Sequence, residues 1–128
     1  MKLFLKVLLS LFIILVLTIG GGFFFITRGL EAGRNLKIED LSLVSLNDGT
    51  YNGEYNAGRW TNEVEVTVKD QRITKIDIVK DVLIPNPEVT KELLDKVVAK
   101  QETNVDVVSG ATVTCKAYLK SIENALKE

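Results

Sequence analysis

A long apolar run opens the chain and contrasts with the alternating patterns that follow it. Residues 7–26 are almost all apolar, and two lysines, Lys2 and Lys6, precede this run. About 20 apolar residues suffice to cross the roughly 30 Å hydrocarbon core of a bilayer. The pattern predicts an N-terminal transmembrane helix over residues 1–27, and the two lysines favour a cytoplasmic N-terminus.

A cleaved signal peptide is the alternative interpretation of this run. Its apolar part would span only about 7–15 residues, and its cleavage site would carry small residues at A-x-A spacing. Residues 30–33, Leu-Glu-Ala-Gly, match that spacing poorly. We therefore expect an uncleaved anchor. A polar juxtamembrane linker over residues 28–40 follows it and either continues the helix or spaces the domain from the bilayer.

Alternation of apolar and polar residues predicts a small sheet in the next part of the chain. Residues 63–69 alternate strictly, and residues 72–80 return after a turn at 70–71, so the two segments form a hairpin. An Asn-Asp-Gly turn signal precedes a further strand over residues 50–55. The side chains expected on the core face of the hairpin are Val64, Val66, Val68, Ile76 and Ile78.

A helical period replaces the alternation in the C-terminal part. Asn86, Pro87 and Glu88 predict a helix start, because Asn caps free N–H groups, Pro fits the first turn and Glu complements the helix dipole. A second helix is expected over residues 114–127. The apolar stripes of the two helices are Val89, Leu93, Leu94, Val97 and Val98, and Ala117, Leu119, Ile122, Ala125 and Leu126.

These elements predict an α+β fold, with a small antiparallel sheet packed with two helices and preceded by one N-terminal transmembrane helix. The 128 residues leave room for the anchor and one small domain. We expect an anchor over residues 1–27, a linker over 28–40 and a single domain over 41–128.

Composition excludes several classes of function. Acidic and basic residues nearly balance, at 17 and 16, so there is no basic excess for binding nucleic acid. The chain has no histidine and a single cysteine, Cys115. Internal disulfides, zinc sites built from Cys and His, and hydrolysis by a Ser-His-Asp or Cys-His arrangement are therefore excluded. We expect no metal site and no catalytic residue in this chain.

A cluster of small and hydroxyl residues lies just before the last predicted helix. The first N–H groups of a helix lack intrahelical partners and carry partial positive charge, which favours a phosphate. Gly110 and Ala111 keep side-chain bulk low there, and Ser109, Thr112 and Thr114 add hydroxyl groups. On the residues alone, a phosphate site remains open beside a simpler interpretation, in which a threonine caps the helix and the glycine makes a turn.

Residues 106–114, Asp-Val-Val-Ser-Gly-Ala-Thr-Val-Thr, resemble the flavinylation motif of the FMN-binding domain family. Members of that family include the C subunit of the sodium-translocating NADH:quinone oxidoreductase and the G subunit of Rnf-type complexes. The resemblance extends over the soluble part. Residues 48–53 are similar to the family's opening strand, and the 64–78 hairpin, Lys100-Gln101 and Ala125-Leu126 also match its pattern.

The resemblance implies that FMN is attached covalently, by esterification of its phosphate to Thr112. Ser109, Gly110 and Ala111 would then shape the backbone around the phosphate, and Asp106 would belong to the pattern read by the modifying enzyme. That enzyme is a separate flavin transferase that uses FAD and a divalent metal. Thr114 is the alternative acceptor and is otherwise expected to be the helix N-cap.

Other side chains have two interpretations each. Trp60, Tyr51 and Tyr55 either stack on the flavin ring or pack in the core, and core packing is preferred. Cys115 is either a small buried residue or a reactive thiolate at a helix start. By analogy with the family, residues 83–85 form a loop wall against the ring. Gln71 stands where the family often has glycine, at a cost of ~1 kcal/mol if its φ is positive.

The expected function is that of an electron-transfer carrier, a single-pass membrane flavoprotein with its N-terminus in the cytoplasm and its FMN domain outside. Its expected partners are the flavin transferase, membrane electron-transfer proteins and the membrane. One alternative is a domain that binds FMN noncovalently as a sensor or assembly module without redox turnover. Another is a structural membrane protein with an accidental motif.

Overall fold

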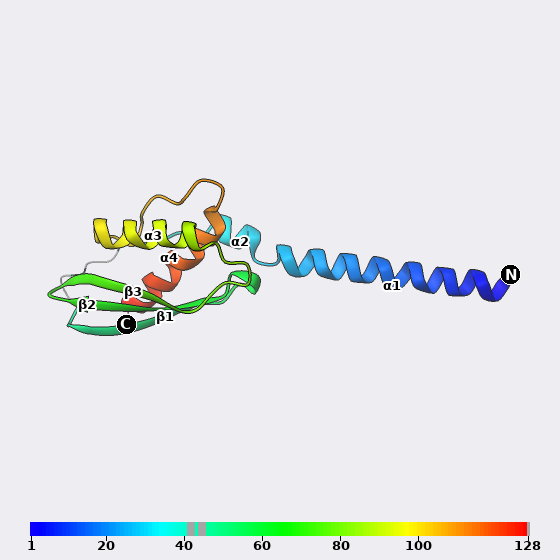
Figure 1. The fold of residues 1–128 in the computed structure, drawn as a ribbon, viewed down its shortest axis with the longest axis horizontal. Coiled ribbons are helices and arrows are strands. Elements are labelled where there is room, and N and C mark those ends of the chain that lie inside the picture. Colours follow the sequence, from blue (N-terminus) through cyan, green and yellow to red (C-terminus); the bar gives the residue numbers. More distant parts are fainter. Residues whose placement is uncertain (41–42, 44–45, 128) are drawn as a thin grey trace.

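Three antiparallel strands form one sheet in the order β1-β2-β3, and two long helices cover one of its faces (Figure 1). The structure is a computed structural model that describes residues 1–40, 43 and 46–127. Its elements are α1 (Lys2–Thr27), α2 (Leu30–Arg34), β1 (Gly49–Tyr55), the 3₁₀ turn η2 (Gly58–Trp60), β2 (Asn62–Lys69), β3 (Arg72–Lys80), α3 (Pro87–Lys100) and α4 (Thr112–Leu126). The predicted α+β fold is confirmed.

The central strand β2 buries its valines as its alternation predicts. Val64, Val66 and Val68 are at most 1% exposed. Asp70 and Gln71 close the β2–β3 hairpin with φ values of 52° and 61°, a left-handed turn that matches the twist of the strands. Neither residue is glycine, so the turn carries a conformational cost of roughly 1–2 kcal/mol per residue.

Strand β3 contributes one core residue that simple alternation misses. Ile73 is 2% exposed and pairs with Val68, whereas Ile76 pairs with Val66. Between these two pairs, β3 spans three residues and β2 only two, which is the signature of a β-bulge in β3. The bulge turns Ile73 onto the same face as Ile76 and Ile78, which are half-buried and pack against the core.

Helix α3 begins at the predicted residue. The Asn86 side chain accepts a hydrogen bond from the Val89 N–H, and Pro87 occupies the first turn. At its other end Gln101 adopts a left-handed conformation with φ 58°. The Gln101 side-chain amide bonds both the N–H and the carbonyl of Ile73, at 2.7 and 2.9 Å. The amide thus occupies backbone groups at the edge of β3 and fixes the helix end against the sheet.

Helix α4 lies closest to the sheet and is buried on several sides. Its predicted apolar stripe is buried throughout, and Tyr118 and Ser121 are buried as well. Where α4 crosses β1, a Cβ atom built on Gly53 would lie 1.9 Å from the Ser121 carbonyl oxygen and 2.4 Å from the Ala125 nitrogen. Any side chain at this position would therefore push the helix off the strand.

The segment between α1 and β1 packs against α4 where the structure describes it. Gly33 of α2 is buried, and a Cβ there would lie 2.5 Å from Val113 Cγ1. The Lys116 ammonium donates to the Arg34 carbonyl at 2.7 Å, and the Thr103 hydroxyl donates to the Glu39 carbonyl. Residues 28–40 are thus docked on the domain. The boundary expected at residue 41 lies outside the described residues.

A buried carboxylate ties the same segment to the end of α4. Glu123 is 0% exposed and accepts from the Lys127 and Lys120 ammonium groups at 2.7 and 2.9 Å. Its second oxygen accepts from the Glu39 N–H at 3.2 Å. Burial opposes the charge on Glu123, but these hydrogen bonds outweigh it and hold the pKa of the carboxyl below its ordinary value.

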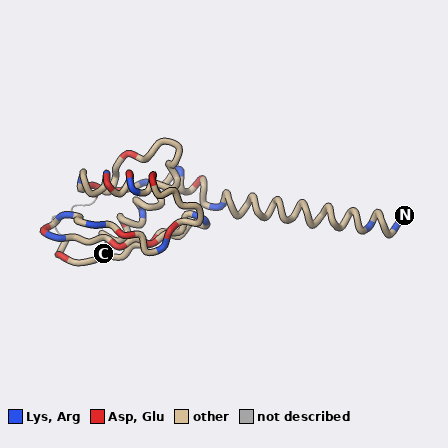
Figure 2. Tube along the Cα trace, in the orientation of Figure 1, with Lys and Arg blue, Asp and Glu red and all other residues tan. Residues whose placement is uncertain are grey.

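Helix α1 extends away from the domain as a separate rod (Figure 1). Its 26 residues span about 39 Å, more than the hydrocarbon core of a bilayer. None of its side chains is buried, and Figure 2 shows it bare of charge between its first turns and the domain. Length, composition and exposure make α1 a helix that can cross a membrane, as expected of a single-pass anchor.

We expect Gly53→Ala to lower the free energy of unfolding by about 3 kcal/mol or more, because the added methyl group meets helix backbone that cannot move away. Chemical denaturation of the detergent-solubilised protein measures the change. Asn52→Ala, at an exposed position of the same strand, is the matched control and should cost little. Equal stability of the two variants would contradict the close crossing.

We expect Glu123→Gln to lower the free energy of unfolding at pH 7 by about 1–3 kcal/mol and to flatten its acid dependence. The folded pKa of Glu123 is lowered, so its contribution is complete above the ordinary glutamate pKa and is lost as the pH falls through the folded value. Denaturation at a series of pH values measures both effects. Glu92→Gln, which removes only an exposed pair with Lys96, should leave the acid dependence unchanged.

Candidate functional site

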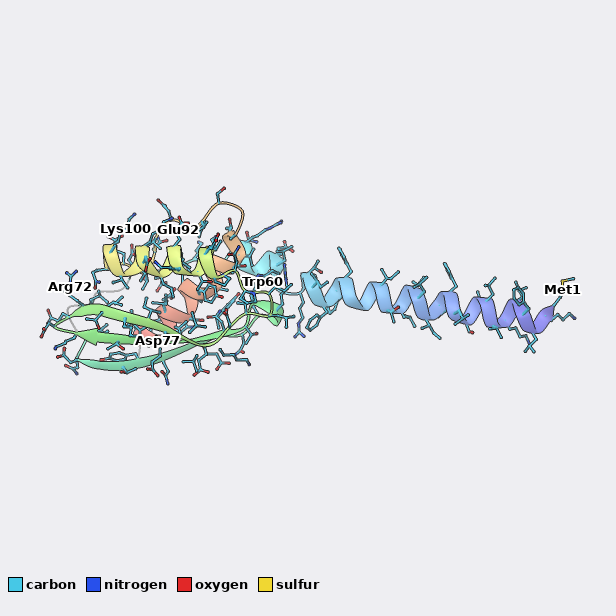
Figure 3. The ribbon with its side chains drawn as sticks, viewed as in Figure 1. Met1, Trp60, Arg72, Asp77, Glu92 and Lys100 are labelled. Atoms are coloured by element: carbon cyan, nitrogen blue, oxygen red, sulfur yellow. The ribbon has the colours of Figure 1, made fainter. Side chains whose placement is uncertain are left out.

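A pocket of about 300 Å³ opens at the N-terminus of α4. Three separate parts of the chain line it: α2, η2 and the residues that lead into α4. The lining residues are Leu30, Arg34, Arg59, Trp60, Gly110, Ala111, Thr112, Val113 and Thr114. The pocket lies at the end of the domain from which α1 leaves, where Trp60 is labelled (Figure 3).

Helix α4 begins two residues earlier than expected, at Thr112. Ala111 is its N-cap and provides no side-chain hydrogen bond, so the prediction that Thr114 is the cap is wrong. The first helical bond described runs from the Cys115 N–H to the Ala111 carbonyl, at 2.9 Å. The N–H groups of the first turn therefore have no capping side chain, and the helix dipole places partial positive charge at this end, beside the pocket.

The glycine of the motif serves the backbone turn. Gly110 has φ +83°, and no heavy atom lies within 4 Å of a Cβ built on it. The fold therefore has room for a side chain at residue 110, but it requires a left-handed backbone there. Residues other than glycine adopt that backbone conformation at a cost of about 1–2 kcal/mol. The turn is closed by a hydrogen bond from the Ala111 N–H to the Val108 carbonyl, at 3.0 Å.

The structure separates the predicted site residues into two groups. Gly110, Ala111, Thr112 and Thr114 line the pocket, and of the two hydroxyl residues Thr112 is exposed while Thr114 is half-buried. Asp106 and Ser109 are exposed in the preceding loop and do not line the pocket. The roles assigned to these residues stay predictions.

Two arginines that the motif does not contain line the same pocket. The Arg59 guanidinium stacks on the Trp60 ring, with Cζ 4.2 Å from the ring centroid. Its Nε atom is buried without a hydrogen-bond partner among the described residues. Arg34 reaches the pocket from α2. Sequence reasoning missed both, because tertiary packing alone brings a juxtamembrane residue and a turn residue to the motif.

The aromatic side chains favour the core interpretation. Trp60 is 3% exposed and one of its faces is covered by the Arg59 guanidinium. The Tyr51 hydroxyl donates to the Asn47 carbonyl at 2.7 Å, and Tyr55 lines a neighbouring hollow at the joint between α1 and α2. Burial raises the pKa of Tyr55. Tyr51 and Tyr55 do not line the pocket, and Trp60, which does, is buried.

The loop after β3 lies beside the pocket without lining it. The Leu83 N–H donates to the Arg59 carbonyl at 2.9 Å, which holds the loop against η2. The Tyr118 hydroxyl of α4 donates to the Asp81 carboxylate and fixes the start of the loop; burial and this bond raise the pKa of Tyr118 to about 12. Leu83 and Ile84 are 62% and 61% exposed, an apolar surface next to the pocket.

Cys115 is a buried core residue and not a reactive one. It is 0% exposed, inside the first turn of α4. Burial raises the pKa of its thiol and outweighs a hydrogen bond with the Val108 backbone and the charge of Lys96, which both lower it. The thiolate interpretation is therefore wrong.

A phosphate group fits the chemistry of this pocket. It would accept hydrogen bonds from the uncapped N–H groups of α4, and two guanidinium groups are present to balance its charge. No carboxylate side chain among the described residues lines the pocket to oppose an anion. The volume lies at the lower end of the range for ligand pockets, so it suits the phosphate end of a nucleotide better than a buried ring system.

Comparison with known proteins identifies the same part of the chain. Residues 59–127 match a family model described as FMN-binding domain, which covers more than half of the 128 residues. The search of curated proteins found no match. The matched segment runs from Arg59 through α4 and includes the whole motif.

We expect Cys115 to react with iodoacetamide at pH 8 at least about a hundredfold more slowly in the native protein than in guanidinium, because its thiol is buried and protonated. Intact mass spectrometry at timed intervals measures the labelling. Since this is the only cysteine of the chain, each added label reports on it alone. Labelling of the native protein at the rate of a small free thiol would contradict the burial.

Proposed function

The chain belongs to the FMN-binding domain family, and we propose that it is a membrane-anchored flavoprotein that carries one FMN covalently through Thr112. In this proposal it passes electrons between a donor in the membrane and an acceptor or partner subunit outside. The observation that carries the proposal is the exposed Thr112 hydroxyl, which stands at the uncapped N-terminus of α4 beside two arginines.

Thr112 is proposed to act as the acceptor in a reaction catalysed by a separate flavin transferase. The Thr112 oxygen forms a bond to the flavin-side phosphorus of FAD, and the pyrophosphate bond breaks so that AMP leaves with its electron pair. The hydroxyl proton passes to a base of the transferase. The pocket supports a role for a separate enzyme, because the described lining residues include no carboxylate or other side chain that accepts a proton near neutral pH.

A covalent phosphoester suits a domain outside the cytoplasm. A cofactor that dissociates is lost by dilution where it cannot be resupplied, and a covalent bond removes that equilibrium. FMN supplies one- and two-electron redox chemistry when bound, while the protein supplies its position and surroundings. Attachment through the phosphate leaves the electronic structure of the ring unchanged.

The position of the pocket supports exchange of electrons at the membrane. The N-terminus of α4 lies at the end of the domain from which α1 leaves (Figure 1). Leu83 and Ile84 offer exposed apolar surface beside the pocket, against which the flavin ring is proposed to lie. The proposed orientation, with the N-terminus in the cytoplasm, rests on Lys2 and Lys6.

We expect Thr112→Ala to abolish covalent flavin. Wild-type protein co-expressed with a flavin transferase should give a fluorescent band on a denaturing gel and an intact mass increased by FMN less one water. Thr112→Ala should give neither, because the acceptor oxygen is gone. Thr114→Ala is the matched control and should keep the band, since its hydroxyl lies two residues further into the helix.

Each outcome of this experiment has a definite meaning. Loss of the band in Thr114→Ala with retention in Thr112→Ala would transfer the acceptor role to Thr114. Flavin that co-purifies with the native wild type but is lost on denaturation would replace the covalent carrier by a noncovalent FMN-binding module. Wild-type protein without any flavin, in the presence of an active transferase, would refute both.

A further inference from the structure

We propose that the juxtamembrane helix α2 is part of the flavin site, and that Arg34 and Arg59 together bind the phosphate group of the flavin nucleotide at Thr112. This inference rests on the proposed function. It assigns a binding role to a segment that precedes the family match, which begins at residue 59. In this view the part of the chain next to the membrane anchor completes the site.

Helix α2 is held against the start of α4 by contacts that leave little freedom. Gly33 lies so close to Val113 that a Cβ atom would fall 2.5 Å from Val113 Cγ1. The Lys116 ammonium donates to the Arg34 carbonyl at 2.7 Å, which fixes the last residue of α2 to the second turn of α4. These contacts fix the backbone of Arg34 beside the residue that carries the acceptor oxygen.

Arg59 reaches the same pocket on a different element and is positioned in advance. Its guanidinium is stacked on the buried Trp60 ring, with Cζ 4.2 Å from the centroid, so its orientation is set before any ligand binds. Its buried Nε donor has no partner in the described part of the protein. The stacking therefore positions a cation whose hydrogen-bonding capacity is not used by neighbouring side chains.

Neither arginine has a carboxylate partner where the structure describes the chain. Within residues 1–40, 43 and 46–127, Arg34 and Arg59 form no ion pair, although six such pairs are formed elsewhere in those residues. Both arginines line one pocket that no described carboxylate lines, so an anion bound between them would attract both.

The charge of a flavin nucleotide matches this arrangement. The pyrophosphate of FAD carries two negative charges, and the phosphodiester formed on Thr112 carries one. Guanidinium groups bind phosphate oxygens through paired N–H donors, which sets orientation as well as affinity. The same two arginines would thus position the FAD phosphorus for attachment and then hold the phosphodiester in place.

The first measurement is the initial rate of flavinylation of the full-length protein by the transferase. We expect Arg34→Ala and Arg59→Ala each to lower the rate about tenfold or more, the effect of losing a charged hydrogen bond. Arg34→Lys should recover part of the rate, because it keeps the charge. Arg28→Ala is the matched control: Arg28 is exposed at the same end of the domain but does not line this pocket.

The second measurement separates a contact with the flavin phosphate from a contact with the transferase. Each variant is driven to full flavinylation, and its thermal midpoint is compared with that of its unmodified form. If Arg34 binds the phosphodiester, flavinylation stabilises the wild type and Arg28→Ala more than Arg34→Ala. Arg34 is exposed, so the unmodified variant should fold, and its own midpoint verifies this.

The outcomes distinguish this inference from the proposed function. Unchanged rates and unchanged flavin-dependent stabilisation in Arg34→Ala, with Thr112 still flavinylated, would overturn the inference and leave the proposed function standing. A lowered rate with unchanged stabilisation would assign Arg34 to transferase recognition and would also overturn it. A wild type that accepts no flavin would overturn both.

Discussion

The close contact between α4 and β1 determines where every other part of the site lies. At Gly53 the strand offers no side chain, so the helix backbone at Ser121 and Ala125 rests directly on the strand. A second glycine, Gly33 of α2, allows a similar approach on another side of α4, at Val113. Held at two points along its length, α4 presents its N-terminus at a fixed position with respect to the sheet and to η2. The position of Thr112 therefore follows from one contact beside it, at Val113, and one about two turns further along the helix.

The two ends of α4 differ in how their charged and polar groups are paired. Near its C-terminus, Glu123 is buried and fully paired, with two ammonium groups and a backbone N–H as partners. At its N-terminus the backbone donors lack a capping side chain, and nearby arginines lack ion pairs among the described residues. One end thus stabilises the fold, while the other keeps its positive potential available for a ligand. Helix α3, capped by Asn86, shows that this chain does cap a helix where no ligand is proposed.

Local patterns predicted the elements, and long-range packing produced what they missed. The alternation of Val64, Val66 and Val68 and the Asn86 cap depend on neighbours in sequence, and both are confirmed. The buried position of Ile73 depends on a bulge opposite β2, which no alternation reveals. The motif located the pocket, but the start of α4 was placed two residues late because Thr114 has the properties of a cap. Arg34 was not predicted because α2 is brought to the motif by contacts across about eighty residues of sequence.

The docking of residues 28–40 has a mechanical consequence for the whole molecule. Helix α1 ends at Thr27 and α2 begins at Leu30, so only two residues join the rod to the domain. Such a joint extends over roughly 10 Å at most, far less than a free segment of thirteen residues would allow. The joint is therefore too short to let the domain move far from the end of α1. In the proposed function, a redox partner would therefore have to meet the domain close to the lipid surface.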